Sequence, residues 1–337
     1  MTIKDVAERC GVSVSTVSRV LNNKPDVSAK VKEKVMRAIE ELHYVPNSTA
    51  RDLVRVGSDA IGLVVRGVGN SFFTEIIPVI ENAASRRGYS VEMVQIKSGE
   101  DELWAGATLA RSKKLRGIIF LGGCFDYTPE QTAILDVPFV CCTYTNSFGN
   151  LPVEIYSSVT INDVQTAYNA TDMLIKKGHR RIVALVPSTD DRSISELRYN
   201  GYCRALEANE IELDKRLVAV TGGYGMVEAK RAIEELFHKG IDFSAVFAIS
   251  DSQAIAAMKV LSEHGISVPE NCSVVGVDGI EVSEYTIPTL TTLAQPKREL
   301  GESSVRILLD IIEGLSEQSH LLLETELREG GSVRNIK

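Results

Sequence analysis

From residue 60 onward, short runs of branched apolar residues alternate along the chain with segments of helical periodicity. A first series of runs reads AIGLVV, SVEMV, GIIFLG and PFVCC, and a second reads IVALV, LVAV, AVFAI and SVVGV. The helical segments between them include residues 74–87, 163–177, 225–238 and 251–264. Alternating strands and helices predict parallel sheets with helices on both faces. Two series of strands predict two doubly wound lobes with a cleft between them.

Length and composition agree with a folded chain of about two domains. The 337 residues are 44% hydrophobic and 24% charged, which excludes wholesale disorder. The charged start MTIKDVAERC lacks the apolar run of a signal peptide, and no run of about 18 apolar residues exists to span a membrane. The six cysteines form no C-x-x-C pair, so we expect no disulfide framework, no metal site and a cytoplasmic location.

The net charge of −8 is divided unevenly along the chain. Residues 1–58 carry ten Lys and Arg against seven Asp and Glu, whereas the remaining residues carry 27 against 38. A basic head on an acidic body indicates that the head alone meets a polyanion. An ordinary solvated surface would explain the same small excess.

The first residues predict two short helices joined by a tight turn. Residues 2–5, Thr-Ile-Lys-Asp, have the form of a capping box, and Gly11 can end the helix that follows. Ser13 can cap a second helix over residues 14–21. This arrangement is a helix-turn-helix, whose second helix would lie in the major groove with Arg19 reaching a base edge. An ordinary two-helix hairpin with a polar face remains the alternative.

A third helix is predicted from about Ser28 to Leu42, and Pro46 interrupts the pattern that follows it. Residues 47–55 form a capped helical stretch of nine residues, too short to be stable alone in water. We therefore expect a linker that becomes ordered only when something holds it. Leu53 lies between two arginines, which is the composition of a wedge that enters the minor groove.

These segments closely resemble the headpiece and hinge of LacI-type transcriptional repressors, the LacI/GalR family. The resemblance lies in TIKDVAERCGVSVSTVSRVLNN, VSAKVKEKV and ELHYVPNSTARDL, and it continues in the body through RYNGY, SDSQAIAAMKVL and GISVPENCSVVGVDGIE. It implies an all-α headpiece over residues 1–45, a hinge over 46–57 and an α/β core over 58–337 that resembles periplasmic binding proteins. The chain would cross between lobes three times, with a first lobe of about 58–160 and 292–322 and a second of about 163–291 and 323–335.

The resemblance also implies a set of DNA contacts. The residues that would contact base edges or phosphates, or contact DNA from the hinge, are Thr2, Ser13, Val14, Ser15, Thr16, Ser18, Arg19, Asn22, Ser28, Asn47, Ala50, Arg51 and Leu53. Asp52 stands where a neutral residue is common, and its charge beside a phosphate should weaken binding slightly. The small Val14 and Ser15 leave the operator sequence open.

Polar and aromatic side chains follow several of the predicted strands, where ligands of open α/β sheets bind. Arg198 and Asp278 suit a polyol, because a guanidinium donates to two oxygens and a carboxylate accepts from two hydroxyls. The resemblance implies that Lys297 also lies near this site. The effector candidates are therefore Phe72, Phe73, Thr143, Arg198, Ser250, Asp278 and Lys297. Core packing would equally explain the two phenylalanines, and a surface position would explain Arg198. Arg66 and Lys297 leave a charged effector open.

We therefore expect a DNA-binding repressor controlled by a small molecule, a sugar or related metabolite, bound between the lobes. A regulator that a purine or phosphorylated co-repressor activates is the alternative. A sugar-modifying enzyme would need a nucleophile or phosphate-loop motif, and Gly-x-Ser-x-Gly and Gly-x-x-x-x-Gly-Lys-Ser/Thr are both absent. We expect no cofactor and no membrane partner. We expect a homodimer on a near-palindromic operator, because no leucine heptad that could form a tetramer follows Leu327.

Overall fold

The computed structural model describes residues 3–21, 28–41, 59–67, 69–97 and 99–337. It divides the chain into two compact units, Met1–Ser58 and Asp59–Lys337. The predicted hinge at residues 46–57 lies outside the described residues.

The first unit holds three helices, α1 (Ile3–Cys10), α2 (Val14–Leu21) and α3 (Ala29–Glu41). Gly11 adopts a φ of +59°, which glycine accepts without steric cost, and it ends α1 as the sequence predicted. The apolar stripes of the three helices meet in one small core, made of Val6, Ala7, Cys10, Val17, Val20, Val35 and Ala38. This small core leaves the opposite face of α2 open to solvent.

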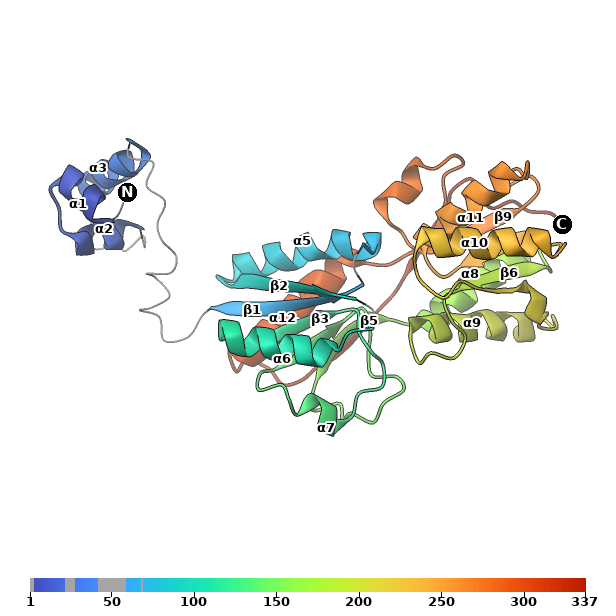
Figure 1. Cartoon of the computed structure of the whole chain (residues 1–337), viewed down its shortest axis with the longest axis horizontal. Coiled ribbons are helices and arrows are strands. Elements are labelled where there is room, and N and C mark those ends of the chain that lie inside the picture. Colours follow the sequence, from blue (N-terminus) through green and yellow to red (C-terminus); the bar gives the residue numbers. More distant parts are fainter. Residues whose placement is uncertain (1–2, 22–27, 42–58, 68, 98) are drawn as a thin grey trace. The chain divides into compact units, whose positions relative to one another are not determined.

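The second unit contains two six-stranded sheets, each in its own lobe (Figure 1). The first sheet has the order β11-β5-β4-β3-β1-β2 and is parallel throughout. Its strands are β1 (Ala60–Arg66), β2 (Ser90–Ile96), β3 (Ile118–Leu121), β4 (Phe139–Cys142), β5 (Ser157–Ile161) and β11 (His320–Leu323).

The second sheet repeats this order as β12-β10-β9-β8-β6-β7, with β12 antiparallel to β10. Its strands are β6 (Ile182–Val186), β7 (Val218–Val220), β8 (Ala245–Ala248), β9 (Ser273–Asp278), β10 (Thr291–Ala294) and β12 (Glu326–Arg328). The two doubly wound lobes predicted from the alternating pattern are therefore confirmed.

Helices cover both faces of each sheet, because the parallel strands are apolar on both sides. The helices of the body are α5 (Ser71–Arg86), α6 (Glu102–Lys113), α7 (Pro129–Thr132), α8 (Asp163–Lys176), α9 (Ile194–Ala208), α10 (Met226–His238), α11 (Asp251–Glu263) and α12 (Lys297–Ile312), with 3-10 turns η1 (Lys215–Leu217) and η2 (Glu281–Tyr285). In the first lobe α5 and α12 bury one face and α6 the other. In the second lobe α10 and α11 cover one face and α8 and α9 the other.

The chain passes between the lobes three times, after β5, after β10 and after β11. Figure 1 shows α12, from late in the sequence, packed among the strands of the first lobe. The sequence assigned the chain from Thr292 onward to the first lobe. In the structure β10 pairs with β9, so the return to the first lobe begins only after Ala294. The run Thr-Thr-Leu-Ala is buried and pairs with its neighbour in the second sheet, which explains the later boundary.

Among the helices that the structure describes, none combines the length and apolar character that crossing a membrane requires.

Candidate functional site

Helix α2 separates its residues cleanly into a packing face and an exposed face. Val17 and Val20 are buried, whereas Val14 is 41% exposed. Ser15 and Arg19 are exposed, and Thr16 and Ser18 are half-buried. The predicted base-reading residues on this helix therefore lie on its solvent side.

Ser13 fixes the start of α2. Its Oγ accepts a hydrogen bond from the Thr16 backbone N–H at 3.2 Å and lies 2.8 Å from the hydroxyl oxygens of both Ser15 and Thr16. A capped helix start with exposed hydroxyls presents the donors that phosphate groups bind.

Ser28 directly precedes α3, and its carbonyl oxygen accepts hydrogen bonds from the Val31 and Lys32 N–H groups, each at 3.0 Å. The remaining predicted DNA contacts lie outside the described residues: Thr2, Asn22, Asn47, Ala50, Arg51 and Leu53.

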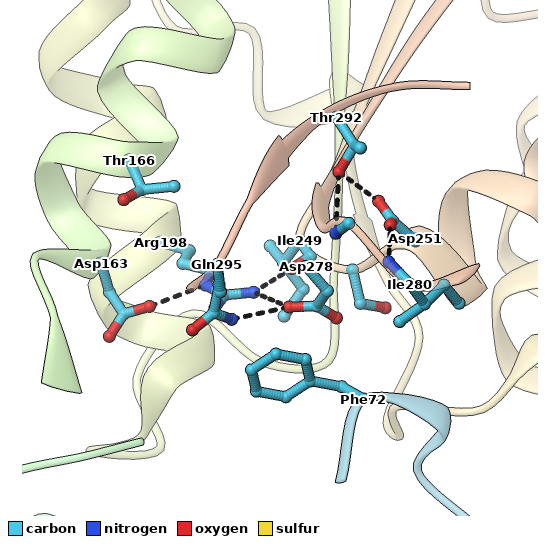
Figure 2. Close-up of polar contacts among 12 residues, drawn as sticks. Phe72, Asp163, Thr166, Arg198, Ile249, Asp251, Asp278, Ile280, Thr292 and Gln295 are labelled. Atoms are coloured by element: carbon cyan, nitrogen blue, oxygen red, sulfur yellow. Dashed lines mark hydrogen bonds and ion pairs between the residues drawn. The ribbon is translucent and has the colours of Figure 1, made fainter. Parts of the chain in front are cut away.

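In the body, Arg198 organises a buried polar cluster at the carboxyl ends of the second sheet (Figure 2). Its Nε donates to Asp163 Oδ1 at 2.9 Å, and its Nη1 lies 3.4 Å from Asp278 Oδ1 and also donates to the Ile249 carbonyl. Gln295 Nε2 donates to the same Asp278 oxygen at 2.8 Å. We call Asp163, Arg198, Asp278 and Gln295 the Arg198 cluster.

Every member of the Arg198 cluster is nearly or fully buried. The side chains of Arg198 and Asp163 are 3% and 2% exposed, so water screens their ion pair little. Burial disfavours charge, but the nearby Asp163 and Asp278 outweigh it and raise the pKa of Arg198. Burial raises the pKa of Asp278, although Arg198 opposes the increase. Among the described residues, Arg198 Nη2 is buried without a hydrogen-bond partner.

Asp278 and Thr143 are also strained in their backbones. Their φ angles are +121° and +75°, a region that residues other than glycine rarely adopt. Both residues end or directly follow a strand, β9 and β4, at the edge of the sheet where ligands bind. Strained residues of this kind cluster at functional sites.

Asp251 lies beside the cluster, at the first position of α11. It accepts hydrogen bonds from Thr292 Oγ1 at 2.6 Å and from the Ile280 N–H at 2.9 Å. Its burial and the neighbouring Asp278 raise the pKa of Asp251 above the usual range. Figure 2 shows this second set of contacts on the far side of Asp278 from Arg198.

The other predicted effector residues lie around this cluster to different degrees. Ser250 caps α11, since its Oγ accepts from the Gln253 N–H at 3.3 Å, and it follows the Ile249 carbonyl that Arg198 contacts. Phe72 is 4% exposed and belongs to the first lobe's core cluster, which also contains Ile280. Thr143 is buried after β4 in the first lobe, and Phe73 packs over Gly122 and against Phe72.

Lys297 is held at the first position of α12. Its Nζ lies 2.8 Å from Glu75 Oε2 on α5 and also donates to the Gly279 carbonyl, next to Asp278. Glu75 Oε1 accepts from the Glu281 N–H at 2.9 Å. These contacts join the first lobe to the second beside the Arg198 cluster.

Arg66, at the end of β1, pairs with the buried carboxylate of Glu102 at 3.3 Å. Glu102 also accepts from the Tyr127 hydroxyl and, at 2.7 Å, from the Cys124 N–H. Desolvation and Glu102 together raise the pKa of Tyr127 and of Cys124, to about 11 for the thiol. This network braces the loop after β3 within the first lobe.

Sequence reasoning did not select Asp163, Gln295, Glu75 or Tyr224 as site residues. Tyr224 is 39% exposed, and its hydroxyl lies 3.2 Å from Ser193 Oγ, one residue before the helix that carries Arg198. Asp163 and Gln295 directly follow β5 and β10, at two of the crossings between lobes, and neither strand was identified in the sequence. Glu75 had no signal in the sequence, because its partner Lys297 is far along the chain.

Comparison with known proteins accounts for both units. A model of bacterial regulatory proteins of the lacI family matches residues 2–47, and a model of a periplasmic binding protein-like domain matches residues 171–333. The HTH-type transcriptional regulator MalR of Clostridium butyricum is 37% identical over 340 residues, which cover 100% of each chain.

Solved structures of regulators also match the full length of the chain. The transcriptional regulator CelR–cellobiose complex has a TM-score of 0.73 at 32% identity, covering 98% of this chain and 99% of that one. The lac repressor dimer bound to operator and the anti-inducer ONPF has a TM-score of 0.79 at 27% identity, covering 99% of each. The head and the body therefore occur together in these relatives as they do here.

Proposed function

Because this chain belongs to the LacI family of bacterial regulatory proteins, whose members are regulators and not enzymes, we propose that it represses transcription under the control of an uncharged sugar-like effector. The observation that carries the effector proposal is the Arg198 cluster, a buried frame of donors and acceptors in which the Nη2 amino group of Arg198 has no partner among the described residues. An effector hydroxyl or ring oxygen supplies an acceptor for this group.

On the DNA side, we assign the reading of the operator to α2. Val14, Ser15 and Arg19 would contact base edges, and Ser13, Thr16, Ser18 and Ser28 would contact phosphates. The exposure of this face and the capped start of the helix support the assignment. Residues 1–45 form the headpiece, 46–57 the hinge and 58–337 the core in this proposal, and the protein acts in the cytoplasm.

We further propose a homodimer on a near-palindromic operator. The lac repressor structure that this chain resembles is a dimer bound to operator. Apolar side chains are exposed on the edge strands of both lobes, with Met93 on β2 at 44% and Val220 on β7 at 55%. A second copy covering these edges would remove apolar surface from water.

The effector would control DNA binding through the tilt of the lobes. Ligand in the cleft favours one arrangement of the two lobes, and the first lobe directly follows the hinge in the chain. A coupling of about 1–3 kcal/mol between the two sites changes operator occupancy severalfold or more. Following the commoner pattern of sugar-responsive repressors, we propose that the effector releases the DNA.

Selection of DNA fragments by the purified full chain tests the reading helix. Wild-type protein should enrich near-palindromic fragments from a genomic library. Arg19→Met should lower affinity for the selected site by about 1–3 kcal/mol, because it loses a fork-shaped contact to a guanine. Arg37→Met is the matched control, since Arg37 is equally an exposed headpiece arginine but lies on α3. Equal losses for the two variants would refute the assignment to α2.

The hinge proposal has its own test. Leu53→Ala should lower affinity for the selected fragment by more than about 1 kcal/mol while sparing binding to random duplex, because unstacking by an apolar wedge is specific to the bound operator. An equal loss on both DNAs would contradict the wedge.

A further inference from the structure

We propose that Glu75 makes the effector site select uncharged ligands, because its carboxylate neutralises Lys297 at the edge of the Arg198 cluster. This inference rests on the proposed function and names the charge of the effector that this same site accepts. Lys297 was, with Arg66, one of the two residues that left a charged effector open in the sequence.

The geometry of the pair leaves Lys297 committed to protein groups. Its Nζ is 2.8 Å from Glu75 Oε2 and donates a second hydrogen bond to the Gly279 carbonyl. The other oxygen of Glu75 is held by the Glu281 N–H at 2.9 Å. Groups from both lobes therefore hold the Glu75 carboxylate, and this carboxylate in turn holds the Lys297 ammonium.

The pair lies directly beside the residues that would bind the effector. Gly279 follows Asp278 in the chain, and Lys297 lies two residues after Gln295, which donates to Asp278 Oδ1. The side chains of Lys297 and Glu75 are only 13% and 27% exposed, so solvent screens their attraction incompletely. A ligand anion would have to displace Glu75 before it could use the charge of Lys297.

The other cations at this edge of the two sheets are paired in the same way. Arg198 lies against Asp163 and Asp278, and Arg66 lies against Glu102. Arg328, whose Nη1 lies 3.4 Å from the Gly279 carbonyl, pairs with Glu284. Each of these cations therefore already has a carboxylate partner. A phosphate group would have to compete with these carboxylates, whereas hydroxyl groups can donate to them and accept from Arg198 Nη2.

Glu75 could instead act only as a brace between the lobes. A brace predicts that its loss lowers stability and leaves anion binding unchanged. Charge selection predicts that its loss creates an anion site whose binding depends on Lys297. The two roles therefore separate in an experiment that measures anion binding.

The experiment uses the full chain and inorganic phosphate as the probe. Thermal unfolding is followed as phosphate replaces chloride at constant ionic strength, for wild type, E75Q, K297Q and the double variant E75Q/K297Q. Wild type should show no saturable stabilisation by phosphate. E75Q should gain a saturable increase in Tm of about 2 °C or more, and E75Q/K297Q should lose it again.

E302Q is the matched control, because Glu302 also pairs with arginines, Arg86 and Arg298, but on the solvent side of α12. It should show no saturable response. A wild-type response that K297Q removes would overturn the proposal, as would an E75Q protein that ignores phosphate or an E302Q protein that responds equally. The measurement uses neither operator nor effector, so failure of the proposed regulatory function would appear separately, in the DNA selection.

Discussion

The two lobes of the body share one strand order but carry different chemistry at the carboxyl ends of their strands. In the first lobe the buried Glu102 is satisfied within that lobe by Tyr127, the Cys124 N–H and Arg66, whose side chain is 21% exposed. In the second lobe Arg198 is 3% exposed and holds two buried aspartates, and its Nη2 group has no partner among the described residues.

This difference indicates a division of labour between two copies of one architecture. The network of the first lobe satisfies the Glu102 carboxylate and braces a loop. The Arg198 cluster of the second lobe is incompletely satisfied, and incompletely satisfied buried groups are the ones that a ligand can complete. The first lobe contributes Phe72 and the Glu75–Lys297 pair to the edge of that cluster.

The largest expected effect comes from removing the central cation of each network. Arg198→Met should lower the free energy of unfolding of the body by about 3–5 kcal/mol, because it leaves buried carboxylates without their partner. Arg66→Met should cost clearly less, since Glu102 keeps its bonds to Tyr127 and Cys124. Urea unfolding measures the free energy of unfolding of both variants. Equal losses would contradict the proposed difference between the networks of the two lobes.

A smaller effect should appear in the pH dependence of stability. Because the folded pKa of Asp251 is raised, by burial and then by Asp278, the folded protein binds this proton more tightly than the unfolded chain. The stability that this tighter proton binding contributes is fully present below the ordinary pKa range of aspartate. It is lost as the pH rises through the raised pKa of the folded state. Each unit by which the folded and unfolded pKa values of Asp251 differ corresponds to about 1.4 kcal/mol in the free energy of unfolding.

Asp251→Asn should therefore flatten the decline in stability between mildly acidic and neutral pH. Unfolding curves collected across that interval provide the measurement. An unchanged slope would show that this carboxylate keeps an ordinary pKa in the second lobe.

The smallest effect concerns the strained residue of the first lobe. Thr143→Gly should stabilise the body by about 1 kcal/mol, because glycine accepts a positive φ that a β-branched residue resists. Thr160→Gly is the control within strand β5, where the same change should destabilise. Stability that falls for both variants would mean that the backbone at Thr143 stores no strain.

The sequence predicted the strands that contain an apolar run, including the partly exposed edge strands β2 and β7. The apolar runs of β1, β3, β4, β6, β8 and β9 were visible because parallel strands bury both sides. β5 was not identified, since Ser-Ser-Val-Thr-Ile lacks a continuous apolar run although every residue of it is buried. The short edge strands β11 and β12 are largely exposed and left no pattern to read.

The candidate site was predictable only where chemistry and position coincide. Arg198 and Asp278 were selected because each follows a strand and suits a polyol, and the structure places them 3.4 Å apart. The pairing of Glu75 with Lys297 could not be read from the sequence, since it depends on how α5 and the start of α12 meet. The same limit applies to the buried partner of Arg198, Asp163, which lies at a crossing between the lobes.

The central claim is that a polar cluster in the second lobe senses an uncharged effector and controls the grip of the headpiece on DNA. It is tested most directly by measuring the occupancy of a selected operator fragment with and without a panel of uncharged sugars, for wild type and Asp278→Asn. We predict at least about a thousandfold preference for the operator over random duplex, a severalfold release by one sugar, and loss of that release alone in the variant. No preference for any fragment, or an equal response from Asp278→Asn, would contradict the account.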